Sequence, residues 1–452
     1  MKKMTEGNII KHLISYALPL IFGNIFQLTY NAVDSIVIGK FAGEDAVAAV
    51  AASNPVMTII ILGVSGMCIG ASVLMSEFYG SGDTENLKKE VATTLIAGIV
   101  FSLAVFGIGM PLAKPILGWM NVPEDILGMA TVYLRIIFVG FLFTFLYNAM
   151  SSALRSTGDS KTPVKFLILS SILNAGLDVL FICGGKMGVV GAGLATVIAE
   201  GFSAILCFVY VYRHIPLLQI KRSEFRVDPE LLKKTLRHGS VTALQQSCQP
   251  IGKVLIQSCM NAQGISVIAA FNAVNRIDDF ACIPEQSISH GMMTCVAQNR
   301  GAGKQSRIKE TLRKGLMLEV LYWACICAAT LLLKTPVMKL FAPEESVEMI
   351  QAGVDYLTLM AFFYILPGLT NGMQGYFRGM GKMKVTLAAT IIQVSLRVVF
   401  VYILVPRIGM TGAAYACMIG WTLMLLYEIP YYFYCEKREK RKGAEHEFSI
   451  QK

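Results

Sequence analysis

Charged residues are scarce in this sequence: 15% of its 452 residues are Asp, Glu, Lys or Arg, whereas 54% are hydrophobic. A soluble domain carries about a quarter charged residues. Twelve apolar stretches are each long enough to cross a hydrocarbon core about 30 Å thick. They lie near 11–38, 47–79, 91–113, 127–153, 163–183, 190–212, 238–258, 267–299, 315–334, 350–377, 385–405 and 411–434. We therefore expect an all-α polytopic membrane protein. A closed β-barrel is excluded, because its spanning strands need far shorter runs.

Metal-binding and nucleotide-binding patterns are also missing from the sequence. The eleven cysteines stand singly, and the nearest pair, Cys325 and Cys327, has no His or Cys partners at metal-ligand spacing. Packing roles are therefore favoured over a disulfide framework or a zinc site. The glycine-rich segment 301–304 lacks both the GxxxxGK[ST] pattern and a preceding strand, so it does not predict a phosphate-binding loop. We expect no cofactor, no metal centre and no enzymatic activity.

The basic residues are divided unevenly between alternate loops. The two termini and the loops 79–90, 154–162, 213–237, 300–314 and 378–384 together hold 29 of the 40 Lys and Arg, whereas the opposite loops hold six. Lys and Arg accumulate in cytoplasmic loops, so we expect both termini in the cytoplasm and the chain in a bacterial-type inner membrane. The net charge of +10 then reflects membrane topology, and we expect no nucleic acid partner.

The chain repeats itself at an offset of 221 to 223 residues. Gly43, Asn54, Gly70, Gly80 and Gly82 meet Gly264, Asn275, Gly291, Gly301 and Gly303, and Tyr133, Arg155 and Gly158 meet Tyr356, Arg378 and Gly381. Two like membrane halves are typical of secondary transporters, whose substrate site lies between the repeats. We expect two pseudo-symmetric six-helix lobes. The first lobe is expected at 1–212 and the second at 238–434. Between them we expect a linker at 213–237 that contains an amphipathic helix. A charged cytoplasmic tail is expected at 435–452.

Four stretches resemble the multidrug and toxic compound extrusion (MATE) family. They are PLIFGNIFQLTYNAVDSIVIG at 19–39, ALRSTGD at 153–159, VAQNRGAGK at 296–304 and GYFRGMG at 375–381. The resemblance covers nearly the whole chain, including its length and its repeat. It implies an antiporter that exports organic, often cationic, compounds in exchange for protons or sodium. The expected partners are such a substrate and the lipid bilayer, with the chain acting as a monomer.

Acidic residues within the apolar stretches of the first half are the candidates for ion coupling. A charge in the bilayer costs about 2.5–3.5 kcal/mol on insertion scales. The presence of Asp34 and Asp178 in apolar stretches therefore requires an explanation. Asn174 lies one helical turn before Asp178. The alternative is that the two acids only cap or bridge helices.

The resemblance adds a role for these residues. Asp34 matches the acid of the family's first helix. Asn174 and Asp178 match the Asn-x-x-x-Asp of helix five in the DinF-like branch. The chain resembles this branch more than the NorM-like branch. Two acids sharing a dry pocket could exchange a proton or hold sodium together with Asn174. Polar groups expected nearby are Tyr30, Asn31, Asn148 and Thr196.

The second half carries different polar residues at the equivalent positions. Asp34 aligns with Leu255, and Gln249 stands where the NorM-like branch has a carboxylate. Asp278 and Glu285 are seven residues apart and share a helical face. Glu285 either attracts a cationic substrate or neutralises Lys253 or Arg397. The residues expected to line a substrate cavity are Gln245, Gln246, Gln249, Arg276, Asp278, Glu285, His290 and Arg397.

Three other functions remain open at this point. A flippase of lipid-linked saccharide precursors has a related fold and favours a centre rich in Arg and Lys, an option that Arg276 and Arg397 keep open. A membrane enzyme requires a His, Asp and Glu cluster at one membrane face, which the sequence does not contain. A channel or receptor explains the internal duplication less well.

Single cysteines introduced into a cysteine-free background test the expected topology. Arg226→Cys should react with a membrane-impermeant maleimide only from the cytoplasmic side, and Gln263→Cys only from outside, because 213–237 and 259–266 are expected on opposite sides. Labelling is compared between intact cells and inverted vesicles. Labelling of position 226 from outside intact cells contradicts the expected orientation.

Overall fold

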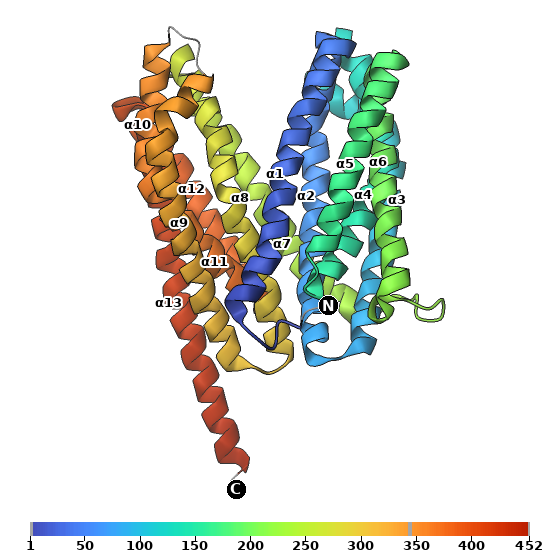
Figure 1. Ribbon diagram of the computed structural model, residues 1–452, viewed down its shortest axis with the longest axis vertical. Helices are drawn as coiled ribbons and strands as arrows, with labels where there is room; N and C mark the ends of the chain where they lie inside the picture. Colours follow the sequence, from blue (N-terminus) through green and yellow to red (C-terminus); the bar gives the residue numbers. More distant parts are fainter. Residues whose placement is uncertain (1–2, 342–345, 451–452) are drawn as a thin grey trace. The chain divides into compact units, whose positions relative to one another are not determined.

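The computed structural model describes residues 3–341 and 346–450, and this part is built from thirteen α-helices with two short π and 3-10 segments (Figure 1). The first half comprises α1 (Ile9–Ala42), α2 (Glu44–Ser81), α3 (Thr84–Trp119), α4 (Glu124–Ser156), α5 (Lys161–Asp178), η1 (Val179–Gly184), α6 (Gly188–His214) and η2 (Pro216–Leu218). The second half comprises α7 (Pro229–Asn261), α8 (Ile265–Gly301), α9 (Gln305–Phe341), α10 (Val347–Phe363), α11 (Ile365–Gly379), α12 (Met383–Ile408) and α13 (Thr411–Ile450).

The helices follow the expected plan of twelve membrane crossings. Among the described residues, nine helices are long and apolar enough to span a membrane, and α10 with α11, bent by 45° at their junction, makes a tenth. Helices α7 and α8, of 33 and 37 residues, have the length for the remaining two crossings. Both contain more polar side chains than the other ten. The expected all-α fold with a six-plus-six repeat is confirmed.

The duplication is visible in the backbone at the turns. Four pairs of equivalent glycines have positive φ: Gly43 (92°) with Gly264 (100°), Gly82 (78°) with Gly303 (69°), Gly158 (85°) with Gly381 (70°), and Gly188 (54°) with Gly409 (66°). Glycine adopts this left-handed conformation without the steric cost that a Cβ imposes. The repeated glycines therefore set the same turns between equivalent helices of the two halves.

By packing, the chain divides into two compact units. Unit 1 runs to Gln246 and includes His290–Thr311 and Gly379–Gly381, whereas unit 2 comprises Ser247–Ser289, Leu312–Arg378 and the chain from Lys382 onward. Unit boundaries fall inside α7, α8, α9 and α11. In α7 and α8 a proline lies close to the boundary, Pro250 and Pro284. The first part of α7 and the last part of α8 thus pack within unit 1.

Within unit 1, α1 lies against α2, α5 and α6, and α4 lies against α2, α3 and α6 (Figure 1). The core is built from two groups of buried side chains, one around Phe145 and Leu154 of α4 and the other around Leu134 and Phe138 of the same helix. Helix α4 is therefore the central element of the first six helices. Within unit 2, α12 packs against α13.

Glycines allow α2 to approach α7 and α8 at backbone contact distance. Gly66 and Gly70 form a GxxxG pair, which favours close helix packing in membranes. A Cβ on Gly66 would lie 2.3 Å from the backbone nitrogen of Ala243, and one on Gly70 would lie 2.5 Å from that of Gly239. These two glycines bring α2 against the first part of α7.

The contact between α2 and the end of α8 is reciprocal. A Cβ on Gly80 would lie 1.9 Å from the carbonyl oxygen of Gln298, and one on Gly301 would lie 1.9 Å from the carbonyl oxygen of Glu77. Gly301 is the repeat equivalent of Gly80, and Gln298 is that of Glu77. Arg300 also forms a two-point ion pair with Glu77, with nitrogen–oxygen distances of 2.6 and 3.2 Å.

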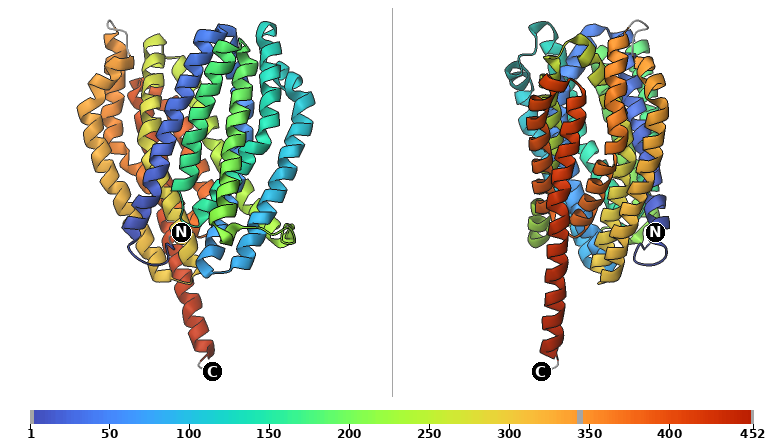
Figure 2. Two further views of the ribbon diagram at one scale, coloured as in Figure 1. Left: turned by 45° about the vertical axis from the view of Figure 1, so that its right-hand side comes forward. Right: turned by 90° about the vertical axis from the view of Figure 1, so that its left-hand side faces the viewer.

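Two segments differ from the expected boundaries. The amphipathic helix expected at the end of the linker starts at Pro229 and continues without a break through α7. The side chain of Asp228 accepts hydrogen bonds from the backbone of Glu230 and Leu231. Helix α13 continues through the expected tail to Ile450 and extends past the other helices of unit 2 (Figure 2). Residues 1–2 of the expected first lobe and 451–452 of the expected tail lie outside the described residues.

Substitution of the reciprocal glycines tests the contact between α2 and α8. Gly80→Ala and Gly301→Ala should each lower the free energy of unfolding by about 1–3 kcal/mol, because the added methyl overlaps a backbone carbonyl that cannot move alone. Gly63→Ala is the matched control: it lies in α2 as well, and a Cβ added there would meet no atom within 4 Å. Thermal melting of the purified variants measures the difference. Equal melting temperatures for Gly80→Ala and Gly63→Ala would show that the close approach is not needed.

Candidate functional site

Asp34 of α1 and Asp178 of α5 stand together in unit 1. Helix α1 contacts both α5 and η1, and the carboxyl groups of Asp34 and Asp178 are electrostatic neighbours. Tyr30, one helical turn before Asp34, also interacts electrostatically with both acids. The structure thus brings together three residues that were singled out from the sequence.

Asn174 and Asp178 are buried polar residues without hydrogen-bond partners. Their side chains are 3% and 1% exposed, and both side-chain polar atoms of each lack a partner in the described part of the chain. Leaving a buried polar group unsatisfied costs about 1–3 kcal/mol. Helix α5 ends at Asp178 and continues directly as the π-helical segment η1, a rare geometry that occurs frequently at functional sites.

The other residues expected near the pair belong to α1, α4 and α6. Asn148 donates a hydrogen bond to the Thr144 carbonyl within α4 at 2.8 Å, and Thr196 donates one to the Ala192 carbonyl within α6 at 3.0 Å. Asn31 is exposed, and its carbonyl accepts a hydrogen bond from Ser35 at 2.9 Å. No hydrogen bond in the described region joins these three side chains to Asp34 or Asp178.

Sequence reasoning missed one acidic residue of this region. Glu200 of α6 accepts a hydrogen bond from the hydroxyl of Thr144. It interacts electrostatically with Tyr30 and with Tyr133 of α4, as do Asp34 and Asp178. Glu200 could have been recognised as a candidate from the sequence, because it is an acidic residue inside the apolar stretch 190–212. The first half therefore presents three acids around two tyrosines.

In the second half, Asp278 is bound by two tyrosines. Its two carboxylate oxygens accept hydrogen bonds from the hydroxyls of Tyr356 at 2.9 Å and Tyr364 at 2.5 Å. Tyr364 stands at the junction between α10 and α11. Arg397 of α12 is an electrostatic neighbour of Asp278. Asp278 thus ties α8 to the bend between α10 and α11.

The remaining second-half residues singled out from the sequence have different surroundings. Lys253 forms an ion pair with Asp279 at 2.7 Å, and both side chains are about half exposed. Gln249 donates a hydrogen bond to Gln393 of α12 at 3.1 Å. Glu285 is fully buried, and one of its oxygens accepts a long hydrogen bond of 3.5 Å from Asn371. Gln245 is buried, Gln246 and His290 are half-buried, and Arg276 is exposed.

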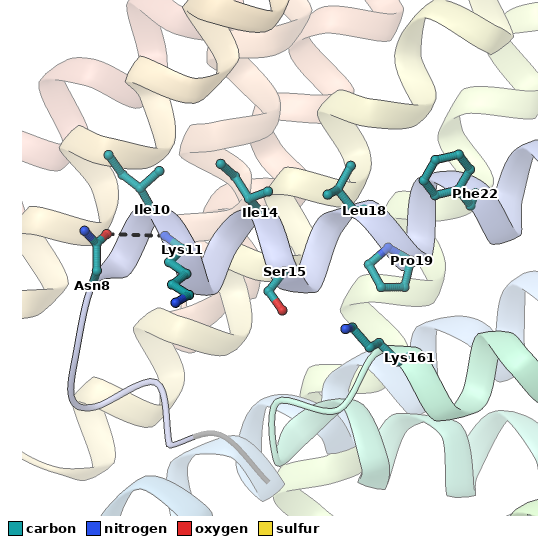
Figure 3. Close-up of a pocket in the computed structure, with 9 residues that line it drawn as sticks. All are labelled: Asn8, Ile10, Lys11, Ile14, Ser15, Leu18, Pro19, Phe22 and Lys161. Carbon is teal, nitrogen blue, oxygen red and sulfur yellow. Dashed lines mark hydrogen bonds between the residues drawn. The ribbon is translucent and has the colours of Figure 1, made fainter.

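A groove of about 720 Å³ lies in unit 1 where α1 and α5 begin (Figure 3). Lys11, Ser15 and Lys161 give it a polar, positively charged side, and Ile14, Leu18 and Phe22 of α1 give it an apolar side. At 1.5 Å per residue, Phe22 is about 18 Å along α1 from Asp34. The groove is therefore separate from the acids, and it contains none of the residues singled out from the sequence.

Comparisons with known proteins agree with this architecture. The family model MatE matches the chain twice, over residues 19–180 and 242–403. The starts of the two matches are separated along the sequence by the same number of residues as the repeat equivalents Tyr133 and Tyr356. The probable multidrug resistance protein YpnP of Bacillus subtilis is 27% identical over 390 residues, 86% of each chain. The probable multidrug resistance protein NorM of Thermotoga maritima is 25% identical over 430 residues, 91% of this chain and 90% of that one. A solved outward-facing multidrug resistance MATE family transporter has a TM-score of 0.90 at 22% identity, covering 98% of this chain and 99% of that one.

Removal of Asp278 tests its role between α8 and the bend. Asp278→Ala should lower the free energy of unfolding by about 1–3 kcal/mol for each tyrosine hydroxyl left without an acceptor. Asp279→Ala is the matched control and should cost less than about 1 kcal/mol, because its ion pair with Lys253 is half exposed. Thermal melting of the purified variants checks the order. A smaller loss for Asp278→Ala than for Asp279→Ala contradicts the structural role.

Proposed function

The chain belongs to the MatE family, whose members are transporters and not enzymes, and from this premise we propose that it exports organic cations in exchange for protons or sodium. The observation that carries the proposal is the neighbouring pair of acids, Asp34 and Asp178, with Asn174 one helical turn before Asp178. The oxygens of Asp178 have no hydrogen-bond partner among the described residues, and both acids lie in membrane-spanning helices, where an uncompensated charge is costly. Uptake of one cation relieves both the repulsion and the missing hydrogen bonds.

Two cations fit this chemistry. A proton placed between Asp34 and Asp178 supplies the donor that two carboxylates lack. Sodium is a hard cation that prefers oxygen ligands, as calcium and magnesium do, and Asn174 adds an amide oxygen to the carboxylates. Asn31, Asn148 and Thr196 complete the proposed coupling region around Tyr30, although their present hydrogen bonds lie within their own helices or at the surface.

The proposed substrate carries positive charge. Acids and amides predominate among the polar residues proposed to line the cavity in the second half, and the related proteins YpnP and NorM are described as probable multidrug resistance proteins. The residues proposed to line the cavity are Gln245, Gln246, Gln249, Arg276, Asp278, Glu285, His290 and Arg397. With the basic loops in the cytoplasm, export runs from the side of the termini to the outside.

Neutralising either coupling acid should stop gradient-driven export. Asp34→Asn and Asp178→Asn keep the side-chain size but cannot hold an exchangeable proton or compensate a cation, so export should fall at least about tenfold while melting changes little. Asp45→Asn, at the exposed start of α2, is the matched control and should export at the wild-type rate. The measurement is uptake of cationic dyes by proteoliposomes with imposed pH and sodium gradients, applied separately.

Each result has a distinct meaning. If Asp34→Asn and Asp178→Asn both export dye at the wild-type rate, the proposed coupling site is contradicted. Export of dye by the wild-type protein still supports the transport function in that case. No dye export under either gradient, with movement of a lipid-linked saccharide instead, favours the flippase. Export under a pH gradient alone identifies the proton as the coupling ion, and export under a sodium gradient alone identifies sodium.

A further inference from the structure

Two lysines border the groove at the starts of α1 and α5, and no acid lines it. Lys11 and Lys161 are exposed, and none of the ion pairs found among the described residues includes either of them. Asp159, which precedes α5, caps that helix instead: its carboxylate accepts hydrogen bonds from the backbone of Lys161 and Thr162 and from the Thr162 hydroxyl. The groove therefore carries two positive charges without a counter-charge among its lining residues.

Two rows of side chains along α1 line the groove, and they differ in polarity (Figure 3). Residues four apart on a helix lie on the same face, and one such row is apolar: Ile10, Ile14, Leu18 and Phe22. Lys11 and Ser15 belong to the second row, on the side of α1 that faces Lys161. Leu18 and Phe22 are 46% and 65% exposed. The groove thus combines an exposed apolar wall with a cationic one.

The charge of the groove decides which class of ligand suits it. An organic cation is repelled by Lys11 and Lys161, so the groove does not suit the substrate proposed above. A zwitterionic headgroup brings its own ammonium group, for which the lining residues offer no carboxylate. An anionic headgroup is attracted by both lysines through its phosphate, and the Ser15 hydroxyl is a further donor in the same row.

The length of the apolar row favours a lipid over a soluble anion. At about 1.5 Å per residue, Phe22 lies about 18 Å from Ile10 along α1, whereas half of a hydrocarbon core about 30 Å thick measures about 15 Å. An acyl chain of one leaflet can therefore lie along the whole row, whereas a free phosphate leaves this exposed apolar surface uncovered. The groove volume of about 720 Å³ falls within the range of about 300–1,000 Å³ that is usual for ligand pockets.

We propose that this groove binds one phospholipid with an anionic headgroup. The phosphate contacts Lys11 and Lys161, and one acyl chain follows the apolar row of α1. With the basic loops in the cytoplasm, the lipid belongs to the cytoplasmic leaflet, where basic pockets between membrane helices bind anionic headgroups. The bound lipid bridges α1 and α5, which carry Asp34 and Asp178 further along, but its binding does not depend on the proposed antiport.

Native mass spectrometry of the purified, delipidated protein in detergent tests the binding directly. Phosphatidylglycerol and phosphatidylethanolamine with the same palmitoyl and oleoyl chains differ in headgroup charge, and each is titrated separately. The first phosphatidylglycerol should bind at least about fivefold more tightly than phosphatidylethanolamine, since one lysine near an anionic lipid contributes about fivefold in affinity. Excess glycerol 3-phosphate should not displace it, because this anion has no acyl chain to cover the apolar row.

Charge and shape of the groove are tested by separate variants. The double variant Lys11→Gln, Lys161→Gln should weaken binding of the first phosphatidylglycerol about 25-fold, about fivefold for each lysine. The matched control Lys40→Gln, Lys114→Gln removes the same charge from exposed lysines outside the groove and should bind as the wild type does. Ser15→Trp keeps Lys11 and Lys161 but fills the groove with an indole ring, and it should weaken binding as strongly as the loss of both lysines.

Photolabelling locates the acyl chain in the wild-type protein. A phosphatidylglycerol that carries a diazirine in one acyl chain should label α1 between Ile14 and Phe22, as mapped by peptide mass spectrometry. If Ser15→Trp does not fold, as judged by melting, this label carries the test of shape, and a label confined to other helices overturns the proposal.

Four further results overturn the proposal. The first is equal affinity for phosphatidylglycerol and phosphatidylethanolamine. The second is a loss of affinity in the Lys40→Gln, Lys114→Gln control as large as in the Lys11→Gln, Lys161→Gln variant. The third is displacement by glycerol 3-phosphate, which assigns the groove to a soluble anion. The fourth is a dimer that Ser15→Trp abolishes, because it assigns the groove to a second copy of this chain.

Discussion

The close approach of α2 to α7 and α8 is the constraint on which the rest of unit 1 depends. Gly80 and Gly301 each place a backbone where a side chain would otherwise stand, and the Glu77–Arg300 pair closes the same contact with charge. Because Gly80 and Gly301 are equivalent in the repeat, α2 and α8 each contribute a glycine from the same repeat position to this contact. The end of α8 is thereby built into unit 1, although the rest of that helix belongs to unit 2.

The fold was largely predictable because membrane spans and duplication both leave strong patterns. Apolar stretches predicted the helices, and glycines at a constant offset predicted the turns that the left-handed backbone at Gly82 and Gly303 realises. The start of a helix at Pro229 followed from the sequence, whereas its unbroken continuation into the next membrane crossing did not. The division inside α7 and α8 depends on packing between distant segments, which hydropathy does not record.

The candidate site was only partly predictable. Asp34 and Asp178 could be paired from the sequence, and in the structure they are electrostatic neighbours, while their coupling role stays a prediction. Glu200 was missed because a single acid within a long apolar stretch gives no hint of its neighbour on another helix. Lys253 was considered as a counter-ion of Glu285, but whether it pairs with Glu285 or with Asp279 depends on side-chain direction, and the structure shows Asp279.

The π-helical segment that follows Asp178 gives α5 a freedom that an α-helix lacks. In α-helical geometry each residue turns the chain by about 100°, and a π segment holds one residue more than its α-helical equivalent. If Val179–Gly184 returned to α-helical pairing, Asp178 would turn by about one such step relative to Gly188 and α6, with no helix sliding or unfolding. Such a rotation about the axis of α5 is confined to one helix and small enough to occur inside a packed bundle.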